Sequence, residues 1–117
     1  GIMAIIAGIN RGFITRAQGL ARIQKTTNFL QNTAQTFHGA YPHWLDGNNG
    51  KVIPFSSNDN GGDLVETSYL IQGLLTARAY FDQSSTDETQ LRSNITTIWE
   101  NVEWDWYTKS NSGSLYW

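Results

Sequence analysis

Residues 15–30, TRAQGLARIQKTTNFL, decide the fold because they carry both a helix start and an amphipathic pattern. Thr15 and Gln18 have the spacing of a capping box, in which the threonine hydroxyl accepts from the Gln18 backbone N–H and the glutamine side chain reaches back. Behind this box, apolar and small residues recur at three- and four-residue spacing, which predicts one buried helix face. The residues of that face are Ala17, Leu20, Ile23, Thr27 and Leu30.

Three further helices are expected, one before this helix and two after it in the chain. Residues 2–10 predict a short apolar helix that ends near Gly12, and the tight Gly-Phe-Ile connection to the next helix makes the two antiparallel. A third helix is expected from Gly62 or Asp63 to Phe81, with Gly73 allowing a close helix crossing. Its apolar side comprises Leu64, Tyr69, Leu70, Leu74, Ala77 and Phe81.

The fourth helix is expected to begin at Ser85, where Ser85 and Glu88 have the spacing of a second capping box. Its apolar stripe comprises Leu91, Ile95, Ile98, Trp99 and Val102. Residues 109–113 have the composition of a loop.

The middle segment breaks the helical period. Residues 41–45 and 51–55 are short extended runs around the turn sequence Asp-Gly-Asn-Asn-Gly, which predicts a β-hairpin. Each arm contains a proline, so the hairpin is expected to be a small edge ribbon.

Helix, helix, hairpin, helix, helix is the pattern of an all-α protein built from helical hairpins, either a solenoid or an α/α toroid. Four helices bury little surface alone, and both ends of the chain fall within apolar or aromatic sequence. We therefore expect residues 1–117 to be part of a longer chain, whose remainder completes the fold.

Composition excludes several classes of function. The net charge is −2 and charged residues make up 15% of the chain, so no basic surface for nucleic acid is expected. Cysteine is absent, which excludes disulfide bonds and thiolate metal sites within this sequence. The apolar start is too short to span a membrane. His38 and His43 are a weak metal signal and are read as hydrogen-bonding loop residues. No metal or cofactor is expected.

Residues 40–66 combine aromatic rings, carboxylates and turn residues before an apolar helix. Rings that stack on sugar faces, beside carboxylates that accept from hydroxyls, indicate a carbohydrate site. Glu66 is the main candidate for general acid catalysis, since partial burial would raise the pKa of a carboxyl group, although the helix N-terminus opposes this. The alternative is a helix-terminal carboxylate without chemistry, and a capping role is the stronger alternative for Asp63.

Glycoside hydrolysis generally requires a second carboxyl group. Within this chain it could be Asp59, Glu103 or Asp105, and no spacing singles one out. Trp44, Tyr41 and Trp106 are the candidates for stacking on sugars, with core packing as the alternative for each.

Two segments resemble a known family. Residues 1–23, GIMAIIAGINRGFITRAQGLARI, and residues 38–81, HGAYPHWLDGNNGKVIPFSSNDNGGDLVETSYLIQGLLTARAYF, look like the glycoamylase-like proteins, which include the family 144 endo-β-1,2-glucanases. The resemblance covers nearly the whole chain and combines long motifs in order.

The resemblance implies an (α/α)6 toroid of which residues 1–117 form the N-terminal part. It also implies a bacterial periplasmic or extracellular enzyme that cleaves β-linked glucan, most specifically an endo-β-1,2-glucanase, by inversion with two carboxylates and no metal.

Glu66 maps to an acidic site residue of the family, and the second acid would lie beyond Trp117, so the chain alone should be inactive. Tyr41, His43, Trp44 and Asp63 become expected substrate contacts, with Lys51 and Asp59 as weaker ones. A glycan-binding protein without activity on the same fold, and a helical scaffold whose aromatics are only core, are the alternatives.

Overall fold

The computed structural model describes residues 1–116, which contain four α-helices, two short strands and one turn of 3₁₀-helix. In chain order these are α1 (Ile2–Asn10), α2 (Arg16–Asn32), β1 (Trp44–Leu45), β2 (Val52–Ile53), α3 (Leu64–Tyr80), α4 (Thr86–Glu100) and η1 (Trp106–Thr108). The prediction of helices with a small β-hairpin is confirmed.

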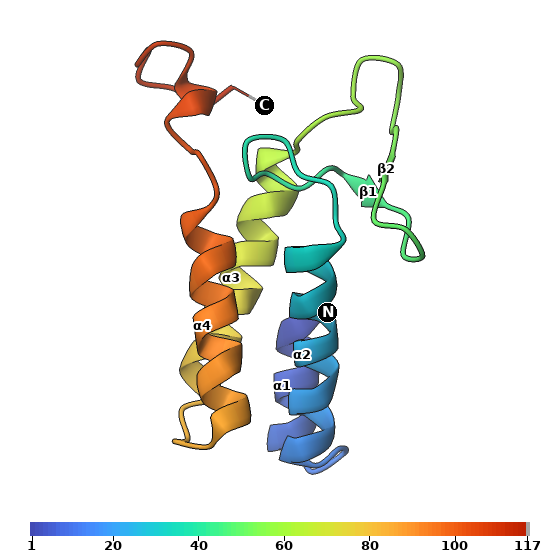
Figure 1. Cartoon of the computed structure of the whole chain (residues 1–117), viewed down its shortest axis with the longest axis vertical. Helices are drawn as coiled ribbons and strands as arrows, with labels where there is room; N and C mark the ends of the chain where they lie inside the picture. The colour runs from blue at the N-terminus through green and yellow to red at the C-terminus, as the bar shows by residue number, and fades with distance from the viewer. Residues whose placement is uncertain (117) are drawn as a thin grey trace.

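The four helices form two antiparallel hairpins that lie side by side (Figure 1). α1 packs on both α2 and α3, and α4 packs on both α2 and α3. The two short interhelix turns lie at one end of the bundle, whereas the β-hairpin, the start of α3 and the segment after α4 gather at the other end (Figure 1). This second end carries the aromatic and acidic residues that are candidates for a functional site.

The core lies mainly between α2, α3 and α4, and it corrects three of the expected helix faces. On α4, Leu91, Ile95 and Ile98 are buried as expected, but Trp99 is 40% exposed. On α2 the buried residues are Gly19, Ile23, Thr27 and Leu30, while Ala17 is exposed. On α3 the apolar side turns so that Tyr69 is 64% exposed and Ile71 takes its place in the core. α3 is apolar on more than one side, so spacing alone did not identify the side that packs against α4.

The helix starts are set by side-chain caps. The Thr15 capping box is confirmed, with Gln18 N–H donating to Thr15 Oγ1 at 3.1 Å and Thr15 N–H donating to Gln18 Oε1 at 2.9 Å. The second box is only half formed: Ser85 Oγ accepts from the Glu88 N–H, but the Glu88 carboxylate binds Arg16 and the Gln83 N–H instead. The half-buried Arg16 guanidinium competes for that carboxylate, which the local sequence could not reveal.

The close helix crossing lies at Gly19 rather than at Gly73. A Cβ on Gly19 would overlap the Ile9 side chain, whereas a Cβ on Gly73 would meet Ile2 at 3.5 Å, an ordinary van der Waals contact. Gly19 therefore lets α1 approach α2 closely.

The β-hairpin pairs Trp44 with Ile53 and Leu45 with Val52. Asp46 organises its turn, because its Oδ1 accepts from the Asn48 N–H at 2.7 Å and its backbone N–H donates to the Lys51 carbonyl. Gly50 has φ +72°, and a Cβ there would overlap the Thr33 carbonyl at the end of α2. The hairpin is thus fixed against α2 at a position that requires glycine.

α1 is the least enclosed helix: none of its residues is fully buried, although its isoleucines pack against the core. At the turn that follows it, Phe13 is 83% exposed. Among the described residues, no helix has the length and apolar character needed to cross a membrane.

Candidate carbohydrate site

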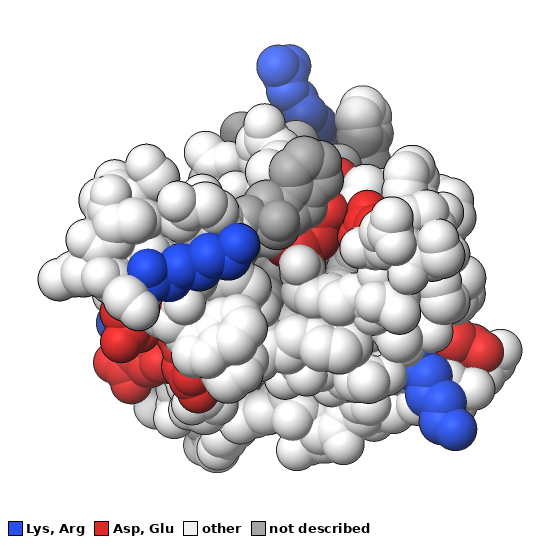
Figure 2. Space-filling view, turned by 90° about the horizontal axis from the view of Figure 1, so that it is seen from above, with Lys and Arg blue, Asp and Glu red and all other residues white. Residues whose placement is uncertain are grey.

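The candidate site lies where the β-hairpin meets the start of α3. Figure 2 shows this end of the molecule, where most of the surface is uncharged and acidic side chains lie near the centre. The aromatic and acidic residues of 40–66, which are far from the helix turns at the opposite end, therefore share one face of the fold.

Asp63 connects the hairpin to the helix. Its Oδ1 caps α3 by accepting from the Glu66 N–H at 3.0 Å, and its Oδ2 lies 2.7 Å from His43 Nδ1. The residue is only 1% exposed. Since a carboxylate can only accept, His43 Nδ1 carries the proton of this bond. The capping role weighed for Asp63 is confirmed, and the same carboxylate also orients the imidazole.

The pKa of His43 is raised, chiefly because of its hydrogen bond to Asp63. Desolvation opposes this effect, and the negative charges of Asp63, Glu66 and Asp59 add to it. Three carboxylates from the loop and the helix start thus surround one imidazole. Nevertheless, no group of acidic or histidine side chains among residues 1–116 has an arrangement that could hold a metal ion.

Glu66 lies in the first turn of α3 with an exposed side chain. The partial burial by apolar neighbours that the sequence suggested is not present: Val65 and Tyr69 are themselves exposed, and Leu64 turns into the core. The carboxylate is accessible to a ligand from the loop side of the molecule.

Trp44, Phe55 and His43 form an aromatic cluster beside these carboxylates. The Trp44 and Phe55 rings meet edge to face at 5.0 Å, and Phe55 lies 4.6 Å from the His43 ring. Trp44 is 50% exposed and Phe55 52% exposed. Sequence reasoning did not single out Phe55, although it lies two positions beyond Ile53, the partner of Trp44, where diagonal side chains meet.

Tyr41 was expected to contact substrate, but the structure places it in the core. Its ring is 6% exposed and its hydroxyl donates to the Leu30 carbonyl at 3.2 Å. Burial raises the pKa of this hydroxyl to about 12. Tyr41 therefore belongs to the core and is not among the sugar contacts proposed below.

The two weaker candidates differ in position. Asp59 lies in a turn closed by the Ser56–Asp59 bridge, as its sequence predicted, and its charge reaches His43. Lys51 is exposed at the hairpin turn, where only its backbone joins the turn bonds that the structure shows.

The other two acids considered as second carboxylates lie after α4. Glu103 Oε2 is 2.8 Å from His38 Nδ1, and Asp105 follows it in an exposed turn. They belong to a separate cluster around Trp106 at the same end of the molecule (Figure 1).

Known proteins are similar to this chain in sequence and in fold. The chain is 51% identical to an endo-β-1,2-glucanase from Chitinophaga pinensis, solved with sophorotriose and glucose, and superposes on it with a TM-score of 0.95. It is 56% identical, again with a TM-score of 0.95, to a β-1,2-glucanase structure from Parabacteroides distasonis. The chain is homologous to the β-1,2-glucanases. The resemblance to the glycoamylase-like proteins and their family 144 endo-β-1,2-glucanases is thereby confirmed.

The match covers only part of each relative. All of this chain aligns with 28% of the C. pinensis structure, and 99% of it aligns with 17% of the P. distasonis structure. A curated P. distasonis protein, an exo β-1,2-glucooligosaccharide sophorohydrolase acting at the non-reducing end, is 56% identical over the whole chain, which spans 16% of its length. No model of a known protein family matches the sequence.

Proposed function

We propose that residues 1–117 form the N-terminal part of a single (α/α)6-toroid domain of a glycoside hydrolase that cleaves β-1,2-glucan. The observation that supports this most directly is the exposed Glu66 carboxylate, whose charge acts on His43, in a chain homologous to β-1,2-glucanases. His43 itself contacts the exposed Trp44 and Phe55 rings. Apolar sugar faces stack on such rings while a neighbouring carboxyl group reaches the glycosidic oxygen. The proposal includes export to the periplasm or the outside of a bacterial cell.

Each residue has a role in this proposal. Glu66 protonates the leaving glycosidic oxygen as the bond to the anomeric carbon breaks. In this proposal the bound glucan and the remainder of the protein supply the burial that residues 1–117 do not give this side chain. A second carboxylate, which we place in the remainder of the protein, takes a proton from a water that attacks the opposite face and inverts the configuration. Trp44 and Phe55 hold the sugar ring. His43, oriented through Nδ1 by Asp63, presents Nε2 to a sugar hydroxyl, which it accepts from when the ring is neutral and donates to when the ring is protonated.

The mode of attack on the chain has two candidates. Endo cleavage is our first proposal, supported by the C. pinensis endo-β-1,2-glucanase. Exo cleavage is the second, because the exo sophorohydrolase is 56% identical to this chain. Time-resolved product analysis separates them: endo cleavage gives a distribution of lengths from the start, whereas exo cleavage gives one short product throughout.

The decisive variant is Glu66→Gln in the full-length protein, which keeps the shape of the side chain and removes the acid. We expect kcat on β-1,2-glucan to fall by about 10²- to 10⁴-fold, with binding retained, because general acid catalysis contributes on this order. Reducing-end release from β-1,2-, β-1,3- and β-1,4-glucan measures activity and linkage, and NMR of the first anomer released measures inversion.

Other results would point elsewhere. Binding of glucan by the unmodified protein without release of reducing ends would favour a glycan-binding protein on the same fold. Activity that survives in Glu66→Gln would leave the hydrolase intact and remove Glu66 from the acid's role. Thr76→Val, on the exposed side of α3 far from the loop end, is the matched control and should leave kcat unchanged.

A further inference from the structure

A second aromatic surface lies next to the candidate site, in the segment that follows α4. It is a hollow of about 940 Å³ lined by residues of the turn 103–111 together with Tyr116. Its volume is in the range of small-molecule sites. Trp106 is its largest exposed side chain, with 54% of its surface accessible.

The Trp106 ring is held in place from one side. The His38 imidazole stacks on it with the ring centroids 3.7 Å apart and the planes 12° apart. Glu103 Oε2 in turn binds His38 Nδ1 at 2.8 Å. His38 covers one face of the indole, and the Tyr107 ring meets the indole at a centroid distance of 4.9 Å with the planes 79° apart. The exposed area belongs to the remainder of the ring, whose orientation these two contacts hold.

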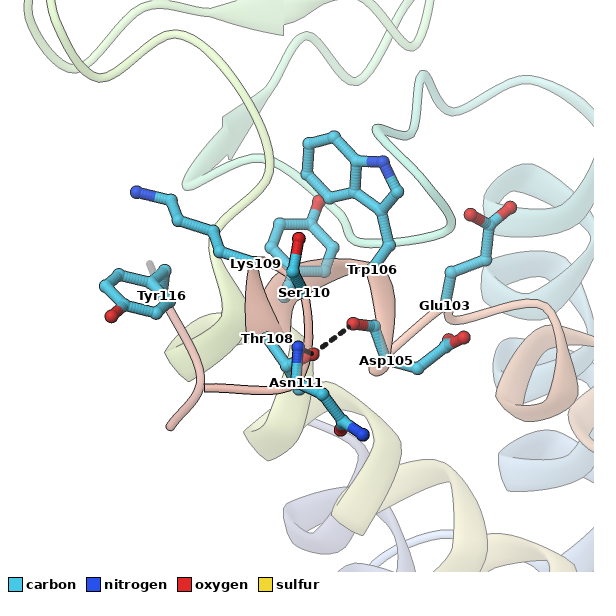
Figure 3. Close-up of a pocket in the computed structure, with 9 residues that line it drawn as sticks. Glu103, Asp105, Trp106, Thr108, Lys109, Ser110, Asn111 and Tyr116 are labelled. Carbon is cyan, nitrogen blue, oxygen red and sulfur yellow. Dashed lines mark hydrogen bonds between the residues drawn. The ribbon is translucent and has the colours of Figure 1, made fainter. Parts of the chain in front are cut away.

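Polar groups surround this ring. Figure 3 shows Lys109 and Tyr116 on one side of the turn and Glu103 on the other, with Trp106 between them. Lys109, Ser110 and Asn111 all have positive φ, which non-glycine residues rarely adopt in succession. Thr108 Oγ1 supports this turn by accepting from the Asn111 N–H at 3.1 Å. Strained backbone of this kind is found preferentially at ligand-binding sites.

The hollow is anchored directly to the start of α3. Tyr107, 7% exposed, packs with Ala40 and Leu64, and its hydroxyl donates to the Phe37 carbonyl. A Cβ on Gly62 would overlap that hydroxyl. Since Gly62 immediately precedes Asp63, the Trp106 surface and the His43–Asp63–Glu66 site lie on adjacent parts of one face.

We propose that the Trp106 surface is a second saccharide subsite, which binds glucosyl units of the same β-linked glucan at a distance from the bond that is cleaved. The glucosyl ring stacks on the open face of Trp106, and Glu103, Asp105 and Asn111 supply hydrogen-bonding groups for its hydroxyls. A neutral sugar suits this hollow, because carboxylates and one lysine line it together. This inference rests on the proposed glucan substrate.

The test uses Trp106→Ala and Trp106→Phe in the full-length protein, with β-1,2-linked glucooligosaccharides of increasing length. For long chains we expect KM to rise about tenfold in the alanine variant, since one aromatic contact is lost, with kcat changed by less than about twofold. The shortest substrate that is cleaved should not reach the subsite and should show no change. Trp106→Phe keeps an aromatic ring, so its KM for long chains should lie between the values of the unmodified protein and the alanine variant.

Trp99→Ala is the matched control, because Trp99 is an exposed tryptophan of α4 that does not line the hollow. It should reproduce the unmodified length dependence. Calorimetric binding of the same oligosaccharides to Glu66→Gln proteins, with and without the Trp106 change, gives a readout independent of turnover. If the alanine variant does not fold, the phenylalanine variant decides the question.

The outcomes separate the two proposals. Equal effects of Trp106→Ala on short and long substrates, or none at all, would overturn the subsite while leaving the hydrolase in place. Binding without hydrolysis that weakens about tenfold in Trp106→Ala would support the subsite and overturn the hydrolase. A protein that neither binds nor cleaves β-1,2-glucan would overturn both.

Discussion

Asp63 acts at the residue scale as both a helix cap and the partner of a histidine. One carboxylate oxygen accepts from the α3 backbone and the other from His43, a residue 20 positions earlier. Because Asp63 is buried, water does not compete strongly for either hydrogen bond. The orientation of His43, and through it the polar side of the candidate site, therefore depends on this single carboxylate.

Asp63→Asn tests that dependence, because asparagine is also a good N-cap but lacks the charge. The pKa of His43 should be raised in the unmodified protein and should fall in Asp63→Asn, since the principal cause of the shift is removed. Asp59→Asn, which removes a smaller contribution, should lower it less. NMR titration of the His43 ring protons measures these values, and an identical titration in all three proteins would contradict the assignment.

The effect on stability has a defined sign. Because the folded pKa of His43 is raised, its contribution is fully present below the unfolded value of about 6.5 and is lost as the pH rises through the folded pKa. The stability deficit of Asp63→Asn should therefore shrink toward alkaline pH. Thermal unfolding of both proteins across this range checks the direction.

At the scale of elements, the β-hairpin is held by its contact with the end of α2. Gly50 donates its N–H to the Asp46 carbonyl and accepts from the Gln35 N–H at 2.7 Å, with no room for a side chain. The hairpin positions Trp44 on one strand and leads into Phe55 on the other side. A displacement of the hairpin turn would therefore move the aromatic cluster.

Gly50→Ala should destabilise the protein by about 3 kcal/mol, because alanine at positive φ is strained and its Cβ would overlap the Thr33 carbonyl. Gly47→Ala is the matched control in the same turn, since open space surrounds Gly47. It should change stability by no more than about 0.5 kcal/mol. Urea unfolding of the full-length protein measures both, and equal effects would show that the hairpin is not fixed at Gly50.

At the scale of the whole molecule, an ion pair between a half-buried arginine and a buried glutamate joins the two helical hairpins at the end opposite the candidate site. Arg16, at the start of α2, makes two bonds of 2.8 and 2.9 Å to Glu88 of α4. Glu88 is 2% exposed, and the Arg16 guanidinium also lies over the Tyr80 and Phe81 rings. The packing of the two helical hairpins against each other thus depends on the ion pair between Arg16 and Glu88.

Glu88→Gln should destabilise the protein by about 2 kcal/mol, because it removes the charge from the carboxylate that accepts two hydrogen bonds from the half-buried Arg16 guanidinium. Asp82→Asn, which removes the exposed partner 3.5 Å from Arg16, is the control and should have little effect. Urea unfolding at neutral pH checks the comparison, and similar values for the two variants would refute it.

The same pair predicts an acid response. The hydrogen bond from Arg16 is the main reason why the pKa of Glu88 is lowered. Its contribution is therefore present above the unfolded value of about 4.3 and is lost as the pH falls through the folded pKa. The difference between the unmodified protein and Glu88→Gln should accordingly narrow on acidification.

The four helices, the Thr15 capping box and the hairpin could be predicted from the sequence alone. These features are local: a 3.6-residue period, a cap three residues long or a turn between two extended runs is present in the chain before it folds. Glu66 and Trp44 were proposed as site residues in the same way, because loop composition beside a helix start is a local signal.

The tertiary structure determines which residues meet across the fold. It buried Tyr41, left Tyr69 and Glu66 exposed, and diverted Glu88 from its cap to Arg16, 72 residues away. It also brought Phe55 against His43 and stacked His38 on Trp106. The physical reason is that burial and pairing depend on the neighbours an element packs against, and those neighbours lie too far along the chain for a local pattern to specify them.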